Sequence, residues 1–147
     1  MKQNLRERRK LLPWYAWGIS VIAIVLTLIV FAGLFISLFE GSLFKNHVSG
    51  FNYFGYHYLG PIWNAQYIAL NVLHIYVGIC SVLLCLGLRF SLMLSLIGYL
   101  IIFIMGILVF FKSGFSDFRL LTAFAFLMLL GLFNIKGKWY AVNSSST

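Results

Sequence analysis

The chain has 147 residues, of which 62% are hydrophobic and only 10% are charged. A typical soluble domain is about 45–50% apolar and about 25% charged, so this chain has too few charges to cover the surface of a water-soluble fold. Its formal net charge of +8 does not indicate nucleic-acid binding, because the basic residues stand at the edges of apolar runs, where they orient membrane helices.

Residues 1–12 form a basic segment, which we predict to be a cytoplasmic N-terminus that faces anionic lipid. The apolar run that follows is longer than the about 7–15 residues of a signal-peptide core, and no small-residue cleavage site ends it. We therefore expect this run to stay in the protein as a membrane span. The basic side chains of the segment are Lys2, Arg6, Arg8, Arg9 and Lys10.

Four apolar runs have the length expected of membrane-spanning helices, which need about 20 residues to cross the hydrocarbon core. Inside a bilayer the backbone amides must find partners within their own segment, so these runs are predicted as helices. A β-barrel is excluded because its strands are about 10 residues long and alternate strictly, whereas these runs do neither. The predicted helices cover residues 14–39, 62–88, 90–111 and 118–135. The expected fold class is an all-α, four-transmembrane-helix antiparallel bundle forming a single membrane domain.

The connections between these helices differ in character. Residues 40–60 form a connection rich in Phe, Tyr, His and Gly, predicted as an aromatic loop at the membrane surface, and Pro61 suits the first turn of the next helix. Residues 87–90 leave almost no loop, which requires a tight antiparallel hairpin of helices. Residues 141–147 form a polar tail.

The distribution of basic residues predicts the orientation of the chain. With the N-terminus inside, eight lysines and arginines face the cytoplasm and three face the other side, which favours both ends in the cytoplasm. The expected location is the plasma membrane, as in a bacterial inner membrane. The three basic residues on the outer side are Lys45, Lys112 and Arg119.

The clearest candidate site is a polar face on the helix predicted at 62–88. Polar or small residues recur there at intervals of three and four, which places them on one face of a helix. One interpretation is helix packing, since small and hydrogen-bonding residues stabilise helix contacts in membranes. The other is a ligand or proton pathway, because an ionisable histidine inside a membrane is often functional. The candidate residues are Tyr67, Asn71, His74 and Ser81.

A metal site is a weaker hypothesis. Glu40, His47 and His57 have the residue types that bind zinc, but their spacing matches no known metal motif. His74 has no second histidine at a matching depth in another span, which argues against a haem held by two histidines. Cys80 and Cys85 lie about 140° apart on one helix and cannot form a disulfide with each other. No cofactor is predicted.

Three classes of function remain open. The leading one is a non-enzymatic membrane component, either an accessory or assembly subunit of a larger complex or a homo-oligomer, because no catalytic motif is visible. The first alternative is a small-solute or proton-linked transporter or channel that uses the polar face. The second is an enzyme acting on lipid or quinone at the outer face through Glu40, His47 and His57. The expected partners are the lipid bilayer and other membrane proteins or a second copy, and no nucleic acid.

Overall fold

The computed structural model describes residues 2–39, 48–53, 56–61, 65–113 and 118–142. These ranges contain five helices and one two-stranded sheet, so the helical fold class is confirmed. Two stretches in them, Trp14–Phe35 and Ser91–Leu108, are long and apolar enough to cross a membrane. In chain order the elements are α1 (Lys2–Leu11), α2 (Trp14–Phe39), β1 (Val48–Tyr53), β2 (Tyr56–Pro61), α3 (Ala65–Leu86), α4 (Ser91–Ser113) and α5 (Phe118–Ala141).

Helix α2 has the predicted bounds, and the ends of α3 and α4 differ from the predicted runs by one to three residues. The larger differences lie at the two ends of the chain. The basic N-terminal segment forms the helix α1, which the sequence analysis did not predict. The predicted end of the last helix at residue 135 is wrong, because α5 continues to Ala141. The apolar run ends near residue 135, but the helix continues because its next turn is well packed. Trp139 supplies that packing, since its side chain is fully buried.

The connection after α2 contains a β-hairpin where an aromatic loop was expected. Strands β1 and β2 pair in antiparallel register, with Val48 opposite Pro61 and Tyr53 opposite Tyr56. Pro61 is therefore the last residue of β2 and not part of a helix. The aromatic residues that suggested a surface loop are also those enriched in strands, and this explains the difference.

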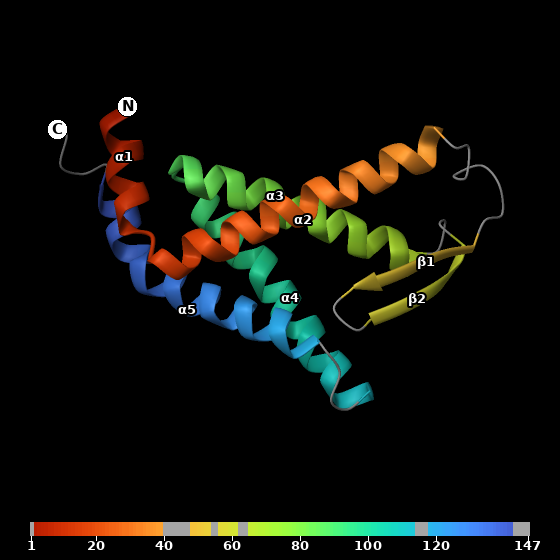
Figure 1. Cartoon of the computed structure of the whole chain (residues 1–147). Helices are drawn as coiled ribbons and strands as arrows, with labels where there is room; N and C mark the ends of the chain where they lie inside the picture. Colours follow the sequence, from red (N-terminus) through yellow and green to blue (C-terminus); the bar gives the residue numbers. More distant parts are fainter. Residues whose placement is uncertain (1, 40–47, 54–55, 62–64, 114–117, 143–147) are drawn as a thin grey trace.

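The four long helices associate as two pairs. Helix α2 packs along α3 and helix α4 packs along α5, while α3 and α4 link the pairs. Figure 1 shows that the pairs meet near α1 and the chain termini and diverge toward the hairpin and the far end of α4.

A glycine faces a threonine at the crossing in each pair. A Cβ on Gly78 of α3 would overlap Thr27 of α2, and a Cβ on Gly106 of α4 would overlap Thr122 of α5. Small residues at a helix crossing let the two backbones approach closely and so increase the van der Waals contact between the helices. These two glycines thus allow the close packing of both pairs.

The turn between α3 and α4 follows the expected tight hairpin. Gly87 has a φ of 78°, a left-handed conformation that side chains disfavour. Its N–H donates to the Leu84 carbonyl oxygen at 2.9 Å, and the Leu88 N–H donates to the Leu83 carbonyl oxygen at 3.2 Å. This pair of hydrogen bonds is the Schellman motif that ends many helices. A Cβ on Gly87 would also lie 2.5 Å from the Leu5 carbonyl oxygen, so glycine lets α1 pack against the turn.

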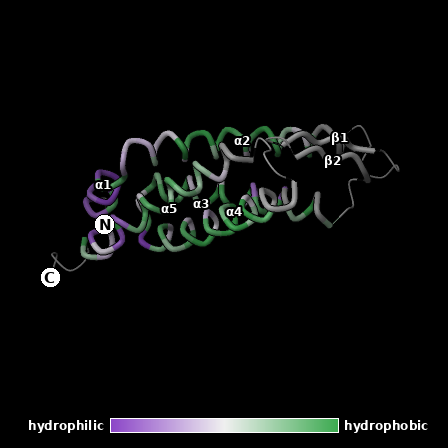
Figure 2. The backbone as a smooth tube through the Cα atoms, turned by 90° about the horizontal axis from the view of Figure 1, so that it is seen from below, coloured by the Kyte–Doolittle hydropathy of each residue, from purple (hydrophilic) through white to green (hydrophobic). Residues whose placement is uncertain are grey.

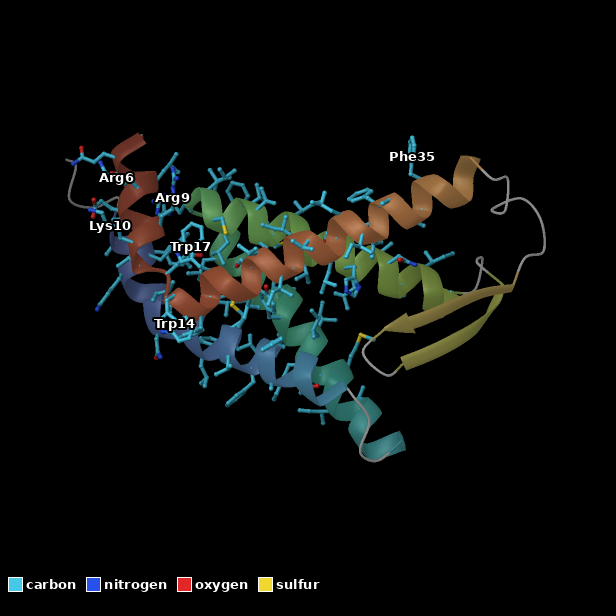
Figure 3. All side chains as sticks on the ribbon, viewed as in Figure 1. Arg6, Arg9, Lys10, Trp14, Trp17 and Phe35 are labelled. Atoms are coloured by element: carbon cyan, nitrogen blue, oxygen red, sulfur yellow. The ribbon has the colours of Figure 1, made fainter. Side chains whose placement is uncertain are left out.

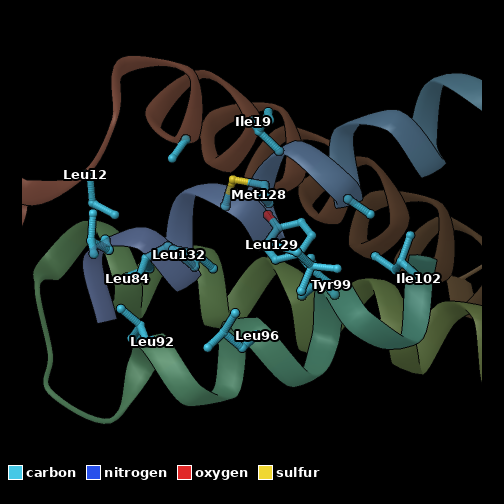
Figure 4. Close-up of a cluster of buried hydrophobic side chains, with 14 of the residues drawn as sticks. Leu12, Ile19, Leu84, Leu92, Leu96, Tyr99, Ile102, Met128, Leu129 and Leu132 are labelled. Atoms are coloured by element: carbon cyan, nitrogen blue, oxygen red, sulfur yellow. The ribbon is translucent and has the colours of Figure 1, made fainter. Parts of the chain in front are cut away.

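The packed core lies where the helices converge. Figure 4 shows leucines of α3, α4 and α5, such as Leu84, Leu92 and Leu132, packed together, and these three are fully buried. Outside this core, each long helix exposes large apolar side chains such as Phe35, Val72, Ile104 and Phe133. The hydrophilic residues gather instead at α1 and at the end of α5, as Figure 2 shows.

Candidate functional site in the polar face of α3

The residues of the predicted polar face all belong to α3 (Ala65–Leu86). Asn71 is 7% exposed, Ser81 is fully buried and His74 is half-buried. Tyr67 belongs to α3 as well, but its side chain lies outside the described part of the structure. The predicted spacing therefore does place Asn71 and Ser81 toward the interior.

The polar contact at the centre of α3 uses the backbone of His74. The Thr27 hydroxyl lies 2.8 Å from the Ala23 carbonyl oxygen on its own helix and 3.1 Å from the His74 carbonyl oxygen on α3. A single hydroxyl proton is shared between these two acceptors. The close approach at Gly78, one turn further along α3, brings the two helices near enough for this contact.

Hydroxyl groups also join α3 to α4. Ser81 Oγ lies 3.2 Å from the Tyr99 hydroxyl, and the Tyr76 hydroxyl donates to the Leu94 carbonyl oxygen at 2.9 Å. Ser95 Oγ donates to the Cys80 carbonyl oxygen at 3.4 Å. These groups satisfy each other or the backbone, which is what buried polar groups require in a low-dielectric interior.

Ser20 of α2 is the exception within the described residues. Its side chain is 1% exposed, and its Oγ has no hydrogen-bond partner there. It lies near the Cys85 thiol and the Tyr99 hydroxyl, which places it next to the Ser81–Tyr99 contact. Both cysteines are free thiols, as their spacing on one helix predicts.

A second polar cluster lies at the end of the molecule that carries α1. Arg8 is 4% exposed; its Nε donates to the Trp139 carbonyl oxygen at 3.2 Å and its Nη1 to the Gly87 carbonyl oxygen at 3.3 Å. These carbonyls lie at the C-terminal ends of α5 and α3, where helix dipoles place partial negative charge. The buried guanidinium thus joins α1 to the ends of two helices.

Burial and the nearby Arg89 guanidinium lower the pKa of Arg8, while Tyr140 acts in the opposite direction. Arg89 lies over the Tyr140 ring, with its Cζ 5.7 Å from the ring centre, a cation–π arrangement. The Trp139 indole N–H donates to the Arg89 carbonyl oxygen at 3.1 Å. Two arginines and two aromatic rings from α1, the Gly87 turn and α5 therefore form one connected unit.

The structure does not test the metal hypothesis. Glu40 and His47 lie outside the described residues, and so does the side chain of His57, whose backbone pairs with Asn52 in the hairpin. Among the residues that are described, no three His, Cys, Asp or Glu side chains gather in a way that could hold a metal ion.

The sequence analysis did not identify two tyrosines and one arginine that make interior contacts. Tyr76 and Tyr99 lie inside apolar runs of the sequence, where a buried phenolic hydroxyl needs a hydrogen-bond partner. Their position in these runs could have predicted the interior contacts. Arg8 was recognised only as one of several basic residues, because its sequence neighbours do not distinguish it from Arg6 or Arg9. Only the tertiary contacts separate the buried arginine from the exposed ones.

Comparison with protein families, with curated proteins and with solved structures finds no match to this chain. An assignment of function therefore rests on the chemistry of its own residues.

Proposed function

We propose that this chain is an integral membrane protein whose helices α2 to α5 cross the bilayer four times, with both ends in the cytoplasm. We further propose that it acts as a non-enzymatic component of a membrane assembly, either with another membrane protein or with copies of itself. Its expected location is the plasma membrane, as in a bacterial inner membrane. Large apolar side chains exposed on all four long helices support the membrane location, because a soluble protein rarely exposes so much apolar surface.

One observation carries the choice of a structural role over a catalytic or transport role. The interior hydroxyls of Thr27, Tyr76, Ser81 and Ser95 make contacts with backbone carbonyls or with another side chain. Polar groups engaged in this way stabilise helix packing. They are then not available to bind a solute without first breaking those bonds.

Helix α2 is the element most suited to contact a partner. Only its inner face is packed, and its outer face exposes apolar side chains along its described length, such as Val25 and Ile29. Gly18 and Gly33 are also on the exposed side, and a Cβ added at either would meet no atom within 4 Å. Another helix could therefore approach α2 closely.

Mass measurement in a mild detergent or in nanodiscs tests the assembly proposal. We expect a species that contains at least two chains, or one chain with a stoichiometric partner. Cysteine substitutions on the outer face of α2, Val25→Cys and Ile29→Cys, should crosslink to that neighbour, whereas Leu130→Cys on the exposed side of α5 serves as the matched control. A strictly monomeric protein with no crosslinks would contradict the proposal.

Thiol labelling in intact cells tests the topology. A cysteine at Gln3, which is exposed on α1, should react with an impermeant reagent only after the membrane is opened. A cysteine at Ser113, at the far end of α4, should react in intact cells. Labelling of both positions in intact cells, or of neither, would contradict the four-span arrangement. The native Cys80 is buried and Cys85 is half-buried, so the chain without an added cysteine is labelled in parallel to give the background.

A proton-linked transporter is the second candidate. It is favoured by the half-buried imidazole of His74, which shares the polar face of the apolar helix α3 with the buried Asn71. The measurement is proton or small-solute flux into liposomes, compared between the wild type and His74→Ala. This substitution keeps the His74 backbone carbonyl that Thr27 contacts, so it should leave the α2–α3 crossing intact. Flux that depends on His74 would favour transport over the assembly role.

A lipid- or quinone-directed enzyme is the third class. It depends on Glu40, His47 and His57, whose side chains lie outside the described residues, so it stays a prediction from the sequence.

A further inference from the structure

Three arginines converge on one turn of the molecule. Arg8 donates a hydrogen bond to the Gly87 carbonyl oxygen at 3.3 Å, and Arg9 Cγ lies 3.4 Å from where a Cβ on Gly87 would be. Arg89 follows two residues later on the same turn and is close enough to Arg8 to lower its pKa. Positive charge is thus concentrated around Gly87.

No acidic group of the described residues offsets this charge locally. Glu7 is exposed on α1 and pairs with Lys10, with its Oε1 2.9 Å from Lys10 Nζ. Arg8 is engaged with helix carbonyls, so the exposed Arg9 and Arg89 remain the two guanidiniums that face solvent beside the turn. Guanidinium groups bind phosphate well because their N–H donors match two of its oxygens at once.

Exposed apolar side chains precede and follow the Gly87 turn. Leu86, just before the turn, is 48% exposed, and Phe90, just after it, is 54% exposed. Figure 3 shows Arg9 on α1, with Trp14 and Trp17 on the adjoining first turns of α2. Aromatic side chains of this kind gather at the boundary between headgroups and hydrocarbon. The site therefore offers cations for a phosphate and apolar surface for acyl chains, side by side.

We propose that Arg9 and Arg89 bind the phosphate of an anionic phospholipid, with its acyl chains lying along Leu86 and Phe90. Arg8 is the positioning residue, because its bonds to the ends of α3 and α5 hold α1 so that Arg9 lies against the Gly87 turn, which is followed by Arg89. The proposal rests on the membrane location proposed above. The proposal assigns a ligand to the basic end of the bundle. This ligand is separate from the packing role proposed above for the polar face of α3.

Native mass spectrometry of the full chain, released from nanodiscs of mixed phosphatidylcholine and phosphatidylglycerol, tests this site. The wild type should retain phosphatidylglycerol in preference to phosphatidylcholine. The double variant Arg9→Gln/Arg89→Gln should lose about 30-fold of that preference, because it removes direct charge-assisted hydrogen bonds between the two guanidiniums and the phosphate. The matched control Arg6→Gln/Lys136→Gln removes the same charge from exposed positions at the same end of the molecule and should lose much less.

Several outcomes would overturn the proposal. Equal losses in the two double variants would mean diffuse attraction to the membrane surface and no specific site. Equal retention of both lipids by the wild type would overturn it directly. Binding of glycerol phosphate as tightly as the lipid would mean that the site takes a soluble phosphate. Failure of the chain to enter nanodiscs would overturn the membrane location as well, whereas entry without lipid preference would leave that location standing.

Salt and the positioning residue supply two further readouts. About 1 M salt shortens the Debye length to about 3 Å, so it weakens diffuse attraction more than direct arginine–phosphate contacts. The wild-type preference should therefore fall less with salt than that of Arg9→Gln/Arg89→Gln. Arg8→Gln should reduce the lipid preference although Arg9 and Arg89 are unchanged. Full preference in Arg8→Gln would remove the positioning role.

Discussion

Arg8 Nε donates a hydrogen bond to the backbone carbonyl oxygen of Trp139, 3.2 Å away, across a separation of 131 residues in the sequence. The contact holds α1 against the C-terminal end of α5, the last helix. The same guanidinium also bonds to Gly87 between α3 and α4. An arginine suits this position because its planar group donates in two directions at once.

Replacing Arg8 should destabilise the end of the molecule where the helices converge. We expect Arg8→Gln to lower the free energy of unfolding by about 3 kcal/mol, because two hydrogen bonds from a charged donor are lost and the carbonyls are left poorly satisfied. Thermal or denaturant unfolding in detergent measures this. The control is Arg9→Gln, an exposed neighbour that makes no hydrogen bond to those two carbonyls and should have little effect. Equal stability of the two variants would contradict a structural role for Arg8.

The Arg8 contacts should not depend on pH in the ordinary range. Burial lowers the Arg8 pKa from its usual value of 12.5, so the unfolded chain holds this proton more tightly than the folded protein does. Stability linked to Arg8 therefore rises only as the pH passes upward through the window between the lowered folded value and 12.5. Arginine is effectively always protonated in proteins, so that window lies far above neutral pH.

Unfolding measured from about pH 5 to about pH 9 should accordingly show the same stability difference between the wild type and Arg8→Gln at each pH. A difference that changes within this range would mean that another titrating group controls the contact. Such a result would contradict the view that the helix carbonyls are the main partners of Arg8.

The α2–α3 crossing should not tolerate a methyl group at Gly78. A Cβ there would lie 2.6 Å from the Thr27 Cβ, so Gly78→Ala must push the helices apart and break the Thr27–His74 contact. We expect a loss of about 1–3 kcal/mol, typical of overpacking in a well-packed interior. Unfolding of the single variants and of Gly78→Ala/Thr27→Ala measures the coupling between the two positions.

The double variant should recover only part of the loss, because Thr27→Ala removes Oγ1 and Cγ2 but keeps the Cβ that lies 2.6 Å from the new methyl group. Gly33→Ala on the exposed side of α2 is the matched control, since a Cβ there meets no atom within 4 Å. Equal destabilisation by Gly78→Ala and Gly33→Ala would mean that close helix approach is not what Gly78 provides.

The Ser81–Tyr99 contact should behave as a modest packing interaction. Its two hydroxyls lie 3.2 Å apart between α3 and α4. Hydrogen bonds between membrane helices average about 0.6 kcal/mol, so a double-mutant cycle with Ser81→Ala and Tyr99→Phe should give a coupling energy near that value. Each variant should leave the oligomeric mass unchanged. Loss of transport with little change in stability would instead assign these residues to a pathway.

The helical interior of this protein could be predicted from its sequence to within a few residues, but the ends of the chain could not. A long apolar run without helix breakers can satisfy its backbone hydrogen bonds within one helix, and α2 begins and ends where hydropathy placed it. The continuation of α5 to Ala141 depends on Trp139, which is buried against partners that are distant in the sequence. The hairpin was missed because its aromatic residues are equally compatible with a loop.

The candidate site on α3 was likewise predicted in part from the sequence. The three- and four-residue spacing on α3 correctly placed Asn71 and Ser81 in the interior, because that spacing is a property of the helix alone. The partners of that face, such as Tyr99 and Thr27, come from other helices whose rotation the spacing does not set.

What the sequence by itself determined is the presence of the four long helices and the inward face of α3, since these follow from hydrogen bonding within each helix and from a fixed helical period. What only the tertiary structure decided is which basic residue is buried. Arg6, Arg8 and Arg9 have the same side chain, but Arg6 and Arg9 are exposed. Arg8 is buried because its guanidinium donates hydrogen bonds to carbonyls at two helix ends, which offset the free-energy cost of burying its charge. The difference comes from long-range packing, which fixes where partial negative charge gathers around α1.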